Sequence, residues 1–360
     1  MTGCTGYARL TPRSAKIVLG AVILVAVAAA AVTLSPLGST NIRPGVKGGA
    51  DVALYRAEVD RIHRGEGYYE AAAAELAPRG FPTRSVFNWR TPLPMWLLGK
   101  LPAAVMGKLL LGGLALLLLA MALEATARDL GDVARGWMRP LACLLLLTGA
   151  LLPTVLGDLF VVPVLWAGVL LALSVCAYGV NRPYTGVAFG LAAVFVRELA
   201  LPYCLLALGI AWWQGRRREM ALWLLGLLAW TTFFALHCWR VSGLIGPDAI
   251  AHQHGWIRFG GAGFVISLAQ MNAYLLLLPQ WVAALYLVAA LVGFGGWTTP
   301  LGTRIGLGVC LFLAAFAAVG QSFNQYWGSL IAPLLCFGVA RLPASLRDLW
   351  TAATRPAVSS

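Results

Sequence analysis

The sequence has little charge. Only 11% of its 360 residues are Asp, Glu, Lys or Arg, whereas 60% are hydrophobic. A soluble domain of this length needs far more polar surface to cover its core. The composition therefore weighs against a large soluble all-α enzyme and favours a chain whose apolar helices, of about 20 residues each, cross a membrane.

Acidic residues are scarcer than basic ones, with 14 against 27, and the net charge is +13. A basic balance can indicate a nucleic-acid-binding protein, but the sequence contains no DNA- or RNA-binding motif. Many of the basic residues instead lie between apolar runs, and Lys and Arg in short loops stay on the cytoplasmic side of a membrane. We interpret the charge as a signal of topology and expect no nucleic-acid partner.

Several signatures of other protein classes are absent. The seven cysteines form no C-x-x-C pair and mostly lie in or beside apolar runs, which favours apolar packing over a disulfide framework or a zinc site. No P-loop, GxGxxG or DxD motif is present, and no Ser/His/Asp arrangement indicates a hydrolase. No internal repeat is visible, which weakens the case for an inverted-repeat transporter.

The apolar residues are gathered in eleven runs. They cover residues 17–34, 103–123, 140–156, 160–179, 184–198, 200–213, 220–239, 264–278, 281–297, 305–320 and 328–340. The first run resembles a signal peptide but is long for one, which favours an uncleaved first span with the N-terminus inside. We expect 184–213 to form two short helices that break at Pro202, and 264–278 to be interfacial or re-entrant.

These choices predict an all-α polytopic membrane helical bundle, a single domain over 1–360 with about ten spans and both termini cytoplasmic. The expected cytoplasmic segments then carry fourteen basic residues, whereas the short outer connections carry only Arg197 at a helix end. This distribution follows the positive-inside rule.

The first extracytoplasmic loop is long and spans 35–102, and a second large outer loop is expected at 240–280. Within the first, the stretch from Asp51 to Arg64 has apolar side chains at spacings of three and four. They are Val52, Tyr55, Val59 and Ile62. The pattern predicts an amphipathic helix that lies flat on the membrane surface, followed by a second surface helix from Tyr68 to Leu76.

Polar residues whose placement near apolar runs costs free energy gather on the outer side in this topology. They are Asp51, Asp158, Glu198, Arg90, Arg197, Arg240, Arg258, His252, His254 and Tyr326. Ionisable groups near apolar runs are expensive and each requires a reason. Residues scattered over most of the sequence are thus expected at one interface, which is the strongest functional argument the sequence offers.

Structural roles remain open for the acidic members of this set. Asp51 and Asp158 each precede a helical stretch and are candidates for helix caps. Arg197 and Glu198 are candidates for pairing with other groups, as structural contacts between two short helices.

The basic members also have alternatives. Arg240 and Arg258 flank a long loop, where arginines can contact lipid headgroups. His252 and His254 have the spacing of two metal ligands on a strand edge, but no third ligand is evident, so the metal signal is weak.

The same residues fit a transfer reaction at the membrane surface. A carboxylate can take the proton from an acceptor hydroxyl as it attacks the anomeric carbon of a sugar. Arginines can hold the phosphate of a lipid-linked sugar and stabilise it as a leaving group. Such a reaction needs no nucleotide-sugar site, in agreement with the missing motifs.

The segment GGADVALYRAEVDRIHRGEGYYEAAAAEL resembles the first outer loop of the GT-C superfamily of integral membrane glycosyltransferases. An acid (Asp51) is followed by an aromatic residue (Tyr55), and Gly65 and Tyr68 frame a turn after the amphipathic helix. One span, a long outer loop and many short-looped spans complete the similarity. It is architectural over most of the chain and residue-level over about 51–96.

The segment FNWRTPLPMWLL, with Arg90 and Pro92, also resembles the return of that loop to the membrane. The resemblance implies that Asp51 is the catalytic base and that Asp158 matches a second acidic position. Asp51 departs from the family because Ala50 precedes it, so it is not part of an acidic pair.

The resemblance further implies hexosyl or pentosyl transfer from a polyprenyl-phosphate-linked sugar in the bilayer to a glycan, lipid or protein acceptor. The reaction would take place on the extracytoplasmic side of a bacterial inner (plasma) membrane, with dependence on a divalent metal left open. Expected substrate-binding residues are Arg90, Arg197, Glu198, Arg240, His252, His254, Arg258 and Tyr326. The alternatives are a polytopic transporter or flippase of a lipid-linked or small solute, and a structural membrane protein.

Overall fold

The computed structural model describes residues 5–35, 48–130, 138–251 and 258–356, and every regular element in these ranges is a helix. The predicted all-α class is therefore confirmed for this part of the chain. The α-helices are α1 (Pro12–Leu34), α2 (Gly48–His63), α3 (Tyr68–Leu76), α4 (Val86–Trp89), α5 (Pro92–Lys100), α6 (Ala104–Leu130), α7 (Met138–Leu151), α8 (Pro163–Gly179), α9 (Pro183–Val196), α10 (Leu201–Trp213), α11 (Arg217–Ser242), α12 (Gly261–Ala269), α13 (Ala273–Leu276), α14 (Gln280–Gly295), α15 (Pro300–Ala318) and α16 (Ala332–Ala353). The 3-10 helices are η1 (Gly6–Arg9), η2 (Leu152–Thr154), η3 (Leu159–Val161), η4 (Glu198–Ala200) and η5 (Ser322–Leu330).

The ten runs expected to cross a membrane coincide with ten of these helices: α1, α6, α7, α8, α9, α10, α11, α14, α15 and α16. Within the described ranges, four helices are long and apolar enough to span a membrane, namely α1, α6, α11 and α15. A fifth is added if η5 and α16, which are bent by 62° relative to each other, form one span. The remaining five apolar helices are shorter, with 10–17 residues. Several helices could thus span a membrane, and the count of ten stays a prediction.

Helices α9 and α10 form a hairpin. Tyr184 at the start of α9 and Gln214 just after α10 line the same cavity, while Arg197 lies at the turn between the two helices. The backbone of Arg197 is extended, with φ −149°, which ends α9. The division of 184–213 into two helices is confirmed, and the break precedes Pro202 because that proline lies in the first turn of α10.

The run 264–278 is divided between two short helices, as an interfacial or re-entrant segment would be. Helix α12 has nine residues and is about 14 Å long, well short of the roughly 30 Å hydrocarbon core. Its backbone at Leu268 lies so close to Gly328 of η5 that a Cβ on Gly328 would be 2.1 Å from a carbonyl oxygen. Helix α12 is therefore packed tightly against η5, within the bundle.

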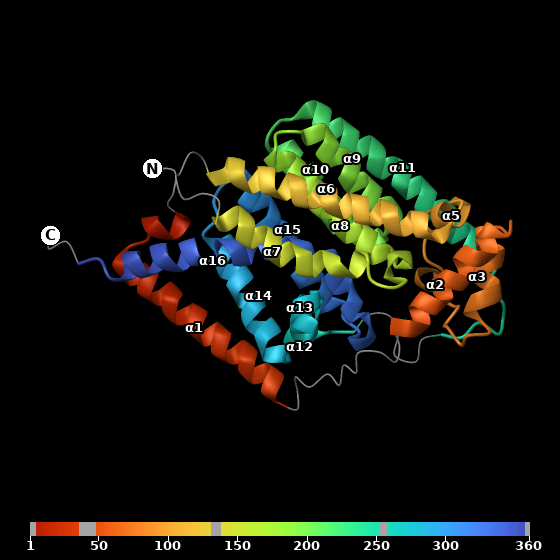
Figure 1. Cartoon of the computed structure of the whole chain (residues 1–360), viewed down its shortest axis with the longest axis horizontal. Coiled ribbons are helices and arrows are strands. Elements are labelled where there is room, and N and C mark those ends of the chain that lie inside the picture. Colours follow the sequence, from red (N-terminus) through yellow and green to blue (C-terminus); the bar gives the residue numbers. More distant parts are fainter. Residues whose placement is uncertain (1–4, 36–47, 131–137, 252–257, 357–360) are drawn as a thin grey trace.

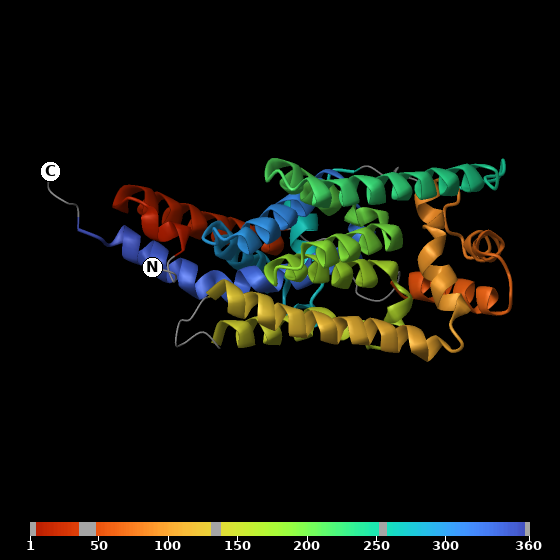
Figure 2. The same ribbon diagram turned by 90° about the horizontal axis from the view of Figure 1, so that it is seen from above.

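Helix α8 lies at the centre of the bundle and is buried almost all round. It packs mainly against α9, α6 and η5. The surface of the bundle is apolar instead of polar, because α1, α6 and α11 expose large side chains such as Leu24, Leu109 and Leu228. Figure 2 shows α6 and α7 on one side of the molecule and α11 on the opposite side. A contiguous outward apolar surface is what a lipid environment requires.

The molecule has two ends, which we name after Asp51 and Arg304. Helices α2, α3 and α5 gather at the Asp51 end, and the two described chain ends lie at the other, the Arg304 end (Figure 1). The chain ends are joined there, because the Thr5 backbone N–H donates to Asp348 over 2.6 Å and Arg355 donates to the Ala8 carbonyl over 3.0 Å.

The apolar stripe of α2 is covered by protein, which corrects the expectation that it rests on lipid. Tyr55, Val59 and Ile62 are buried, and α2 packs against α5 and α3. The approach to α5 is close enough that a Cβ on Gly99 would lie 2.5 Å from Ile62 Cγ2. An amphipathic pattern predicts a buried face but does not distinguish lipid from a neighbouring helix. The second predicted surface helix has the same bounds as α3.

Candidate functional site

Asp51 lies in the first turn of α2, which begins three residues earlier at Gly48. The helix-cap alternative for Asp51 is therefore wrong. Burial raises the pKa of its carboxyl, and the positive charges of Arg90 and Arg197 partly offset that effect. A carboxylate with a raised pKa is a stronger proton acceptor, and the two arginines favour its ionised form.

Arg90 follows α4 in an unusual backbone conformation, with φ 55° and ψ 167°. This region is occupied almost only by glycine and costs about 1–3 kcal/mol for other residues. Three contacts hold its side chain. Nε donates to the hydroxyl of Tyr55 over 3.0 Å, Nη2 donates to the hydroxyl of Tyr326 over 3.1 Å, and Nη1 donates to the Phe87 carbonyl.

The backbone around Arg90 is held as firmly as its side chain. The Tyr68 hydroxyl contacts the carbonyl oxygens of both Trp89 and Arg90, the latter over 3.2 Å. Burial alone would lower the pKa of Arg90, but nearby Tyr55, Tyr326 and Glu198 more than offset it, so the pKa is raised and the guanidinium stays charged. The fold thus fixes one permanent cation beside Asp51.

Arg197 and Glu198 occupy the turn between α9 and α10. Arg197 is only 3% exposed, and its Nη1 forms an ion pair with Glu198 Oε1 over 3.0 Å. Glu198 Oε2 is buried and has no hydrogen-bond partner among the described residues. Arg197 and Glu198 thus pair with each other, not with other groups as the structural alternative expected, and the unpaired oxygen is one that a ligand hydroxyl can satisfy.

The structure brings together five of the predicted site residues with one further tyrosine, and we call this group the Asp51 cluster. It consists of Asp51, Tyr55, Arg90, Arg197, Glu198 and Tyr326. Its members come from four chain segments that are far apart in sequence. Two cations, two carboxyl groups and two phenols thus lie together at one end of the bundle.

Asp158, predicted as a second acidic site residue, forms an ion pair with Arg56 of α2. It precedes η3 at the cap position, but its side chain makes no capping hydrogen bond. Both partners are exposed, at 46% for Arg56 and 45% for Asp158, and such pairs contribute about 0–1 kcal/mol. Asp158 is thus paired with an exposed arginine that is not a member of the Asp51 cluster.

Arg240 and Arg258 are not members of the Asp51 cluster. Arg240 is exposed, with its guanidinium 5.3 Å from the centre of the neighbouring Trp239 ring. Arg258 is exposed, and its carbonyl accepts a hydrogen bond from Gly320 over 2.7 Å. His252 and His254 lie outside the described residues. Across the described ranges, no group of three His, Cys, Asp or Glu side chains is arranged to hold a metal ion.

Sequence reasoning missed several polar groups near the Asp51 cluster. In η5, buried atoms of Gln325 and Trp327 have no hydrogen-bond partner in the described part of the chain. Tyr55 lies one helical turn after Asp51, a spacing that places both on the same face of α2. Tyr55 was named only as part of the GT-C resemblance, and this spacing is a signal from which it could have been predicted as a site residue.

Glu58, two turns after Asp51, is a buried carboxyl on α2. It is 2% exposed, and its Oε2 has no hydrogen-bond partner among the described residues. Burial raises its pKa from 4.5 to about 8, although the charge of Arg90 opposes the shift. Between these two values the folded chain keeps a proton that the unfolded chain has lost. The contribution of Glu58 to stability therefore falls as the pH rises from about 4.5 to about 8.

We expect Glu58→Gln to remove this pH dependence. The measurement is the melting temperature in detergent, followed by tryptophan fluorescence. Between about pH 5 and about pH 8, the melting temperature of the parent should fall relative to that of Glu58→Gln. Above about pH 8, the difference between the two proteins should stay constant. Glu70→Gln on α3, where the carboxyl is exposed, is the matched control and should parallel the parent. Parallel curves for Glu58→Gln and the parent would contradict the shifted pKa.

A large cavity lies away from the Asp51 cluster. It is lined by residues at the opposite ends of α9 and α10, including Tyr184 and Gln214. Because α9 has 14 residues, the two places are about 20 Å apart. We locate the candidate site at the Asp51 cluster, since that is where the carboxylates and arginines of opposite charge converge.

No protein-family model, curated protein or solved structure gives a significant match to this chain. A function is therefore inferred from two sources. One is the chemistry of the Asp51 cluster, and the other is the GT-C resemblance carried by residues 51–96.

Proposed function

We propose that the chain is a membrane glycosyltransferase that moves a hexosyl or pentosyl group from a polyprenyl-phosphate carrier to a glycan, lipid or protein acceptor. The observation that carries the proposal is the Asp51 cluster, in which a half-buried carboxyl group lies beside two arginines. A base next to cationic phosphate ligands is the arrangement that transfer from a phosphate leaving group requires.

In the proposed reaction, an acceptor hydroxyl attacks the anomeric carbon of the sugar and gives its proton to Asp51. The bond between that carbon and the phosphate oxygen breaks, and polyprenyl phosphate leaves with the electron pair. The raised pKa of Asp51 strengthens it as a proton acceptor, and the charges of Arg90 and Arg197 favour its ionised form. The products are the glycosylated acceptor and polyprenyl phosphate.

Arg90 is the proposed phosphate ligand. A guanidinium has five N–H donors, and the three contacts of Arg90 use three of them. Two donors are left for phosphate oxygens, in a fork that Tyr55 and Tyr326 hold in place. Such preorganised donors stabilise charge on the leaving phosphate without reorganisation during the reaction.

The proposed setting is the extracytoplasmic face of a bacterial inner membrane. In this proposal ten helices cross the bilayer, the Asp51 end faces outward, and both termini are cytoplasmic. Two observations support it: the basic residues of the short connections gather at the Arg304 end, and both described chain ends lie there too.

Transport of a lipid-linked or small solute is the alternative. Transporters typically hold their substrate at broken helices near the bilayer midplane. The buried pair Arg197 and Glu198 lies at a helix break, but α9 and α10 form a hairpin there instead of one interrupted span. This arrangement favours the transferase.

Reconstitution separates the two functions. We expect the purified chain in liposomes to transfer label from a polyprenyl-phosphate hexose or pentose to an acceptor fraction, with release of polyprenyl phosphate. Empty liposomes incubated with the same donor and acceptor give the background. Movement of intact donor or solute across the bilayer, without cleavage of any donor, would contradict the proposal and favour the transporter.

A further inference from the structure

A cavity of about 1470 Å³ opens at the Arg304 end, between α9, α10, α11 and α15. Its charged lining residues are Arg216, Arg217, Arg218, Arg304 and Glu219. Four arginines against one carboxylate leave a net charge of +3. The cavity is therefore suited to an anion, and none of its lining residues belongs to the Asp51 cluster.

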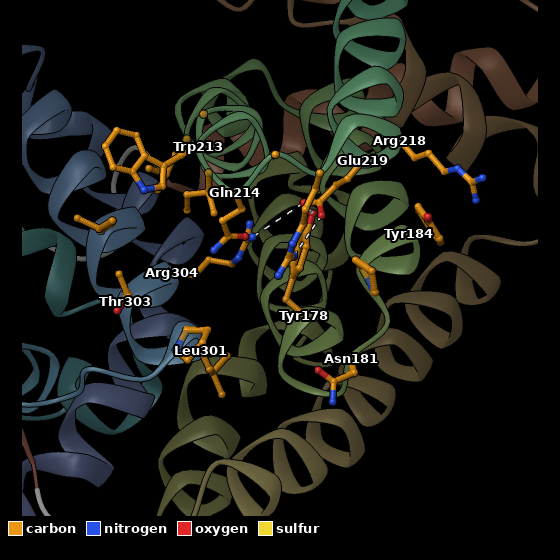
Figure 3. Close-up of a pocket in the computed structure, with 18 of the residues that line it drawn as sticks. Tyr178, Asn181, Tyr184, Trp213, Gln214, Arg218, Glu219, Leu301, Thr303 and Arg304 are labelled. Carbon is orange, nitrogen blue, oxygen red and sulfur yellow. Dashed lines mark hydrogen bonds and ion pairs between the residues drawn. The ribbon is translucent and has the colours of Figure 1, made fainter.

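Arg304 is the buried centre of this cavity. It is 5% exposed, and its guanidinium carbon lies 3.5 Å from the centre of the Tyr178 ring. Its Nη2 is 4.0 Å from Glu219 Oε1, whereas its Nη1 has no hydrogen-bond partner among the described residues. In Figure 3, Arg304, Tyr178 and Glu219 face one another in the middle of the view. A buried cationic N–H without an acceptor is costly, and an anionic ligand would satisfy it.

Glu219 offsets only one of the four positive charges, and its two oxygens are held by Tyr178 and Arg216. Oε1 accepts a hydrogen bond from the Tyr178 hydroxyl over 2.7 Å, and Oε2 pairs with Arg216 over 3.3 Å. Trp223 Nε1 in turn donates to the Tyr178 hydroxyl over 3.2 Å. These contacts fix Tyr178 beneath the guanidinium of Arg304, so that the site is already formed without a ligand.

Part of the remaining wall of the cavity is apolar and continues onto the outer surface of the bundle. Leu205 and Trp213 of α10 and Leu307 of α15 line the cavity and are exposed. Free phosphate and nucleotides have no hydrocarbon chain that could pack against these apolar side chains. A ligand that carries both a phosphate and hydrocarbon chains matches the whole lining.

We infer that this cavity binds the phosphate headgroup of an anionic membrane lipid, with the phosphate on Arg304 and the acyl chains along α10 and α15. Arginine forms strong charge-assisted hydrogen bonds with phosphate oxygens, which accounts for the buried guanidinium. The inference does not depend on the function of the Asp51 cluster, because it concerns other residues at the opposite end of the molecule.

Thermal unfolding of the full chain in neutral detergent tests the inference. We expect added dioleoylphosphatidylglycerol to raise the melting temperature in a saturable way, because a ligand of the folded state stabilises it. Dioleoylphosphatidylcholine and inorganic phosphate are the comparison probes and should have much smaller effects. An equal response to phosphatidylcholine would overturn the anionic headgroup, and an equal response to inorganic phosphate would overturn the lipid.

Variants locate the binding. Arg304→Gln, and separately Arg216→Gln combined with Arg217→Gln, should weaken the apparent affinity for phosphatidylglycerol about tenfold or more. Arg13→Gln on α1 is the matched control, because Arg13 is exposed at the same end but does not line the cavity. If Arg304→Gln does not fold, the double variant decides the result. Unchanged affinity in the double variant, or the same loss in Arg13→Gln, would overturn the inference.

Discussion

Asp51→Asn is expected to abolish sugar transfer, lowering kcat/KM about a hundredfold to ten thousandfold. Asparagine has nearly the same size and shape as aspartate, so α2 and its packing should persist. The amide cannot accept the proton of the acceptor hydroxyl, and the positive charges of Arg90 and Arg197 lose the anion that they flank. The measurement is donor consumption by reconstituted protein, with expression and melting temperature checked in parallel.

Asp60→Asn is the matched control for that experiment. Asp60 lies on the same helix, but its side chain is exposed. We expect this variant to keep the activity of the parent, since it touches no member of the Asp51 cluster. Full activity in Asp51→Asn would remove Asp51 as the base and would direct attention to Glu198, which has a buried oxygen without a partner among the described residues.

Much of the fold could be predicted from the sequence because it depends on local patterns. The apolar runs located the long helices, and the bounds Tyr68–Leu76 were predicted as the structure has them. What the sequence could not decide was the environment of each face. The stripe that includes Tyr55 and Ile62 is buried against α5 instead of lipid, because periodicity indicates a hidden face without naming its neighbour.

The candidate site was predictable only in part, for a similar reason. Topology assigns residues to an end of the bundle, and that was enough to name Asp51 and Arg90 together. It does not give the direction of a side chain. Asp158 turns to the exposed Arg56, and Arg240 extends beside Trp239, so neither side chain joins the Asp51 cluster. These orientations depend on tertiary packing, which the sequence pattern does not contain.

Arg90→Gln is expected to lower kcat/KM about a hundredfold to a thousandfold, which is the typical cost of removing one preorganised donor to a developing negative charge. Donor consumption under subsaturating donor measures the effect. Arg90→Lys should recover only part of the activity, since lysine keeps the charge but not the planar fork that meets Tyr55 and Tyr326. Arg84→Gln changes an exposed arginine of the same loop and should retain activity.

The backbone of Arg90 allows a sharper version of the test. Its φ and ψ lie in a region that glycine occupies without strain, so Arg90→Gly keeps the turn while it removes the guanidinium. If Arg90 serves only to shape the turn, this variant should remain active. We expect it to be as inactive as Arg90→Gln, because the side chain, held by two phenol oxygens beside Asp51, would be the part that meets the phosphate. Activity near that of the parent in Arg90→Gly would remove Arg90 as the phosphate ligand.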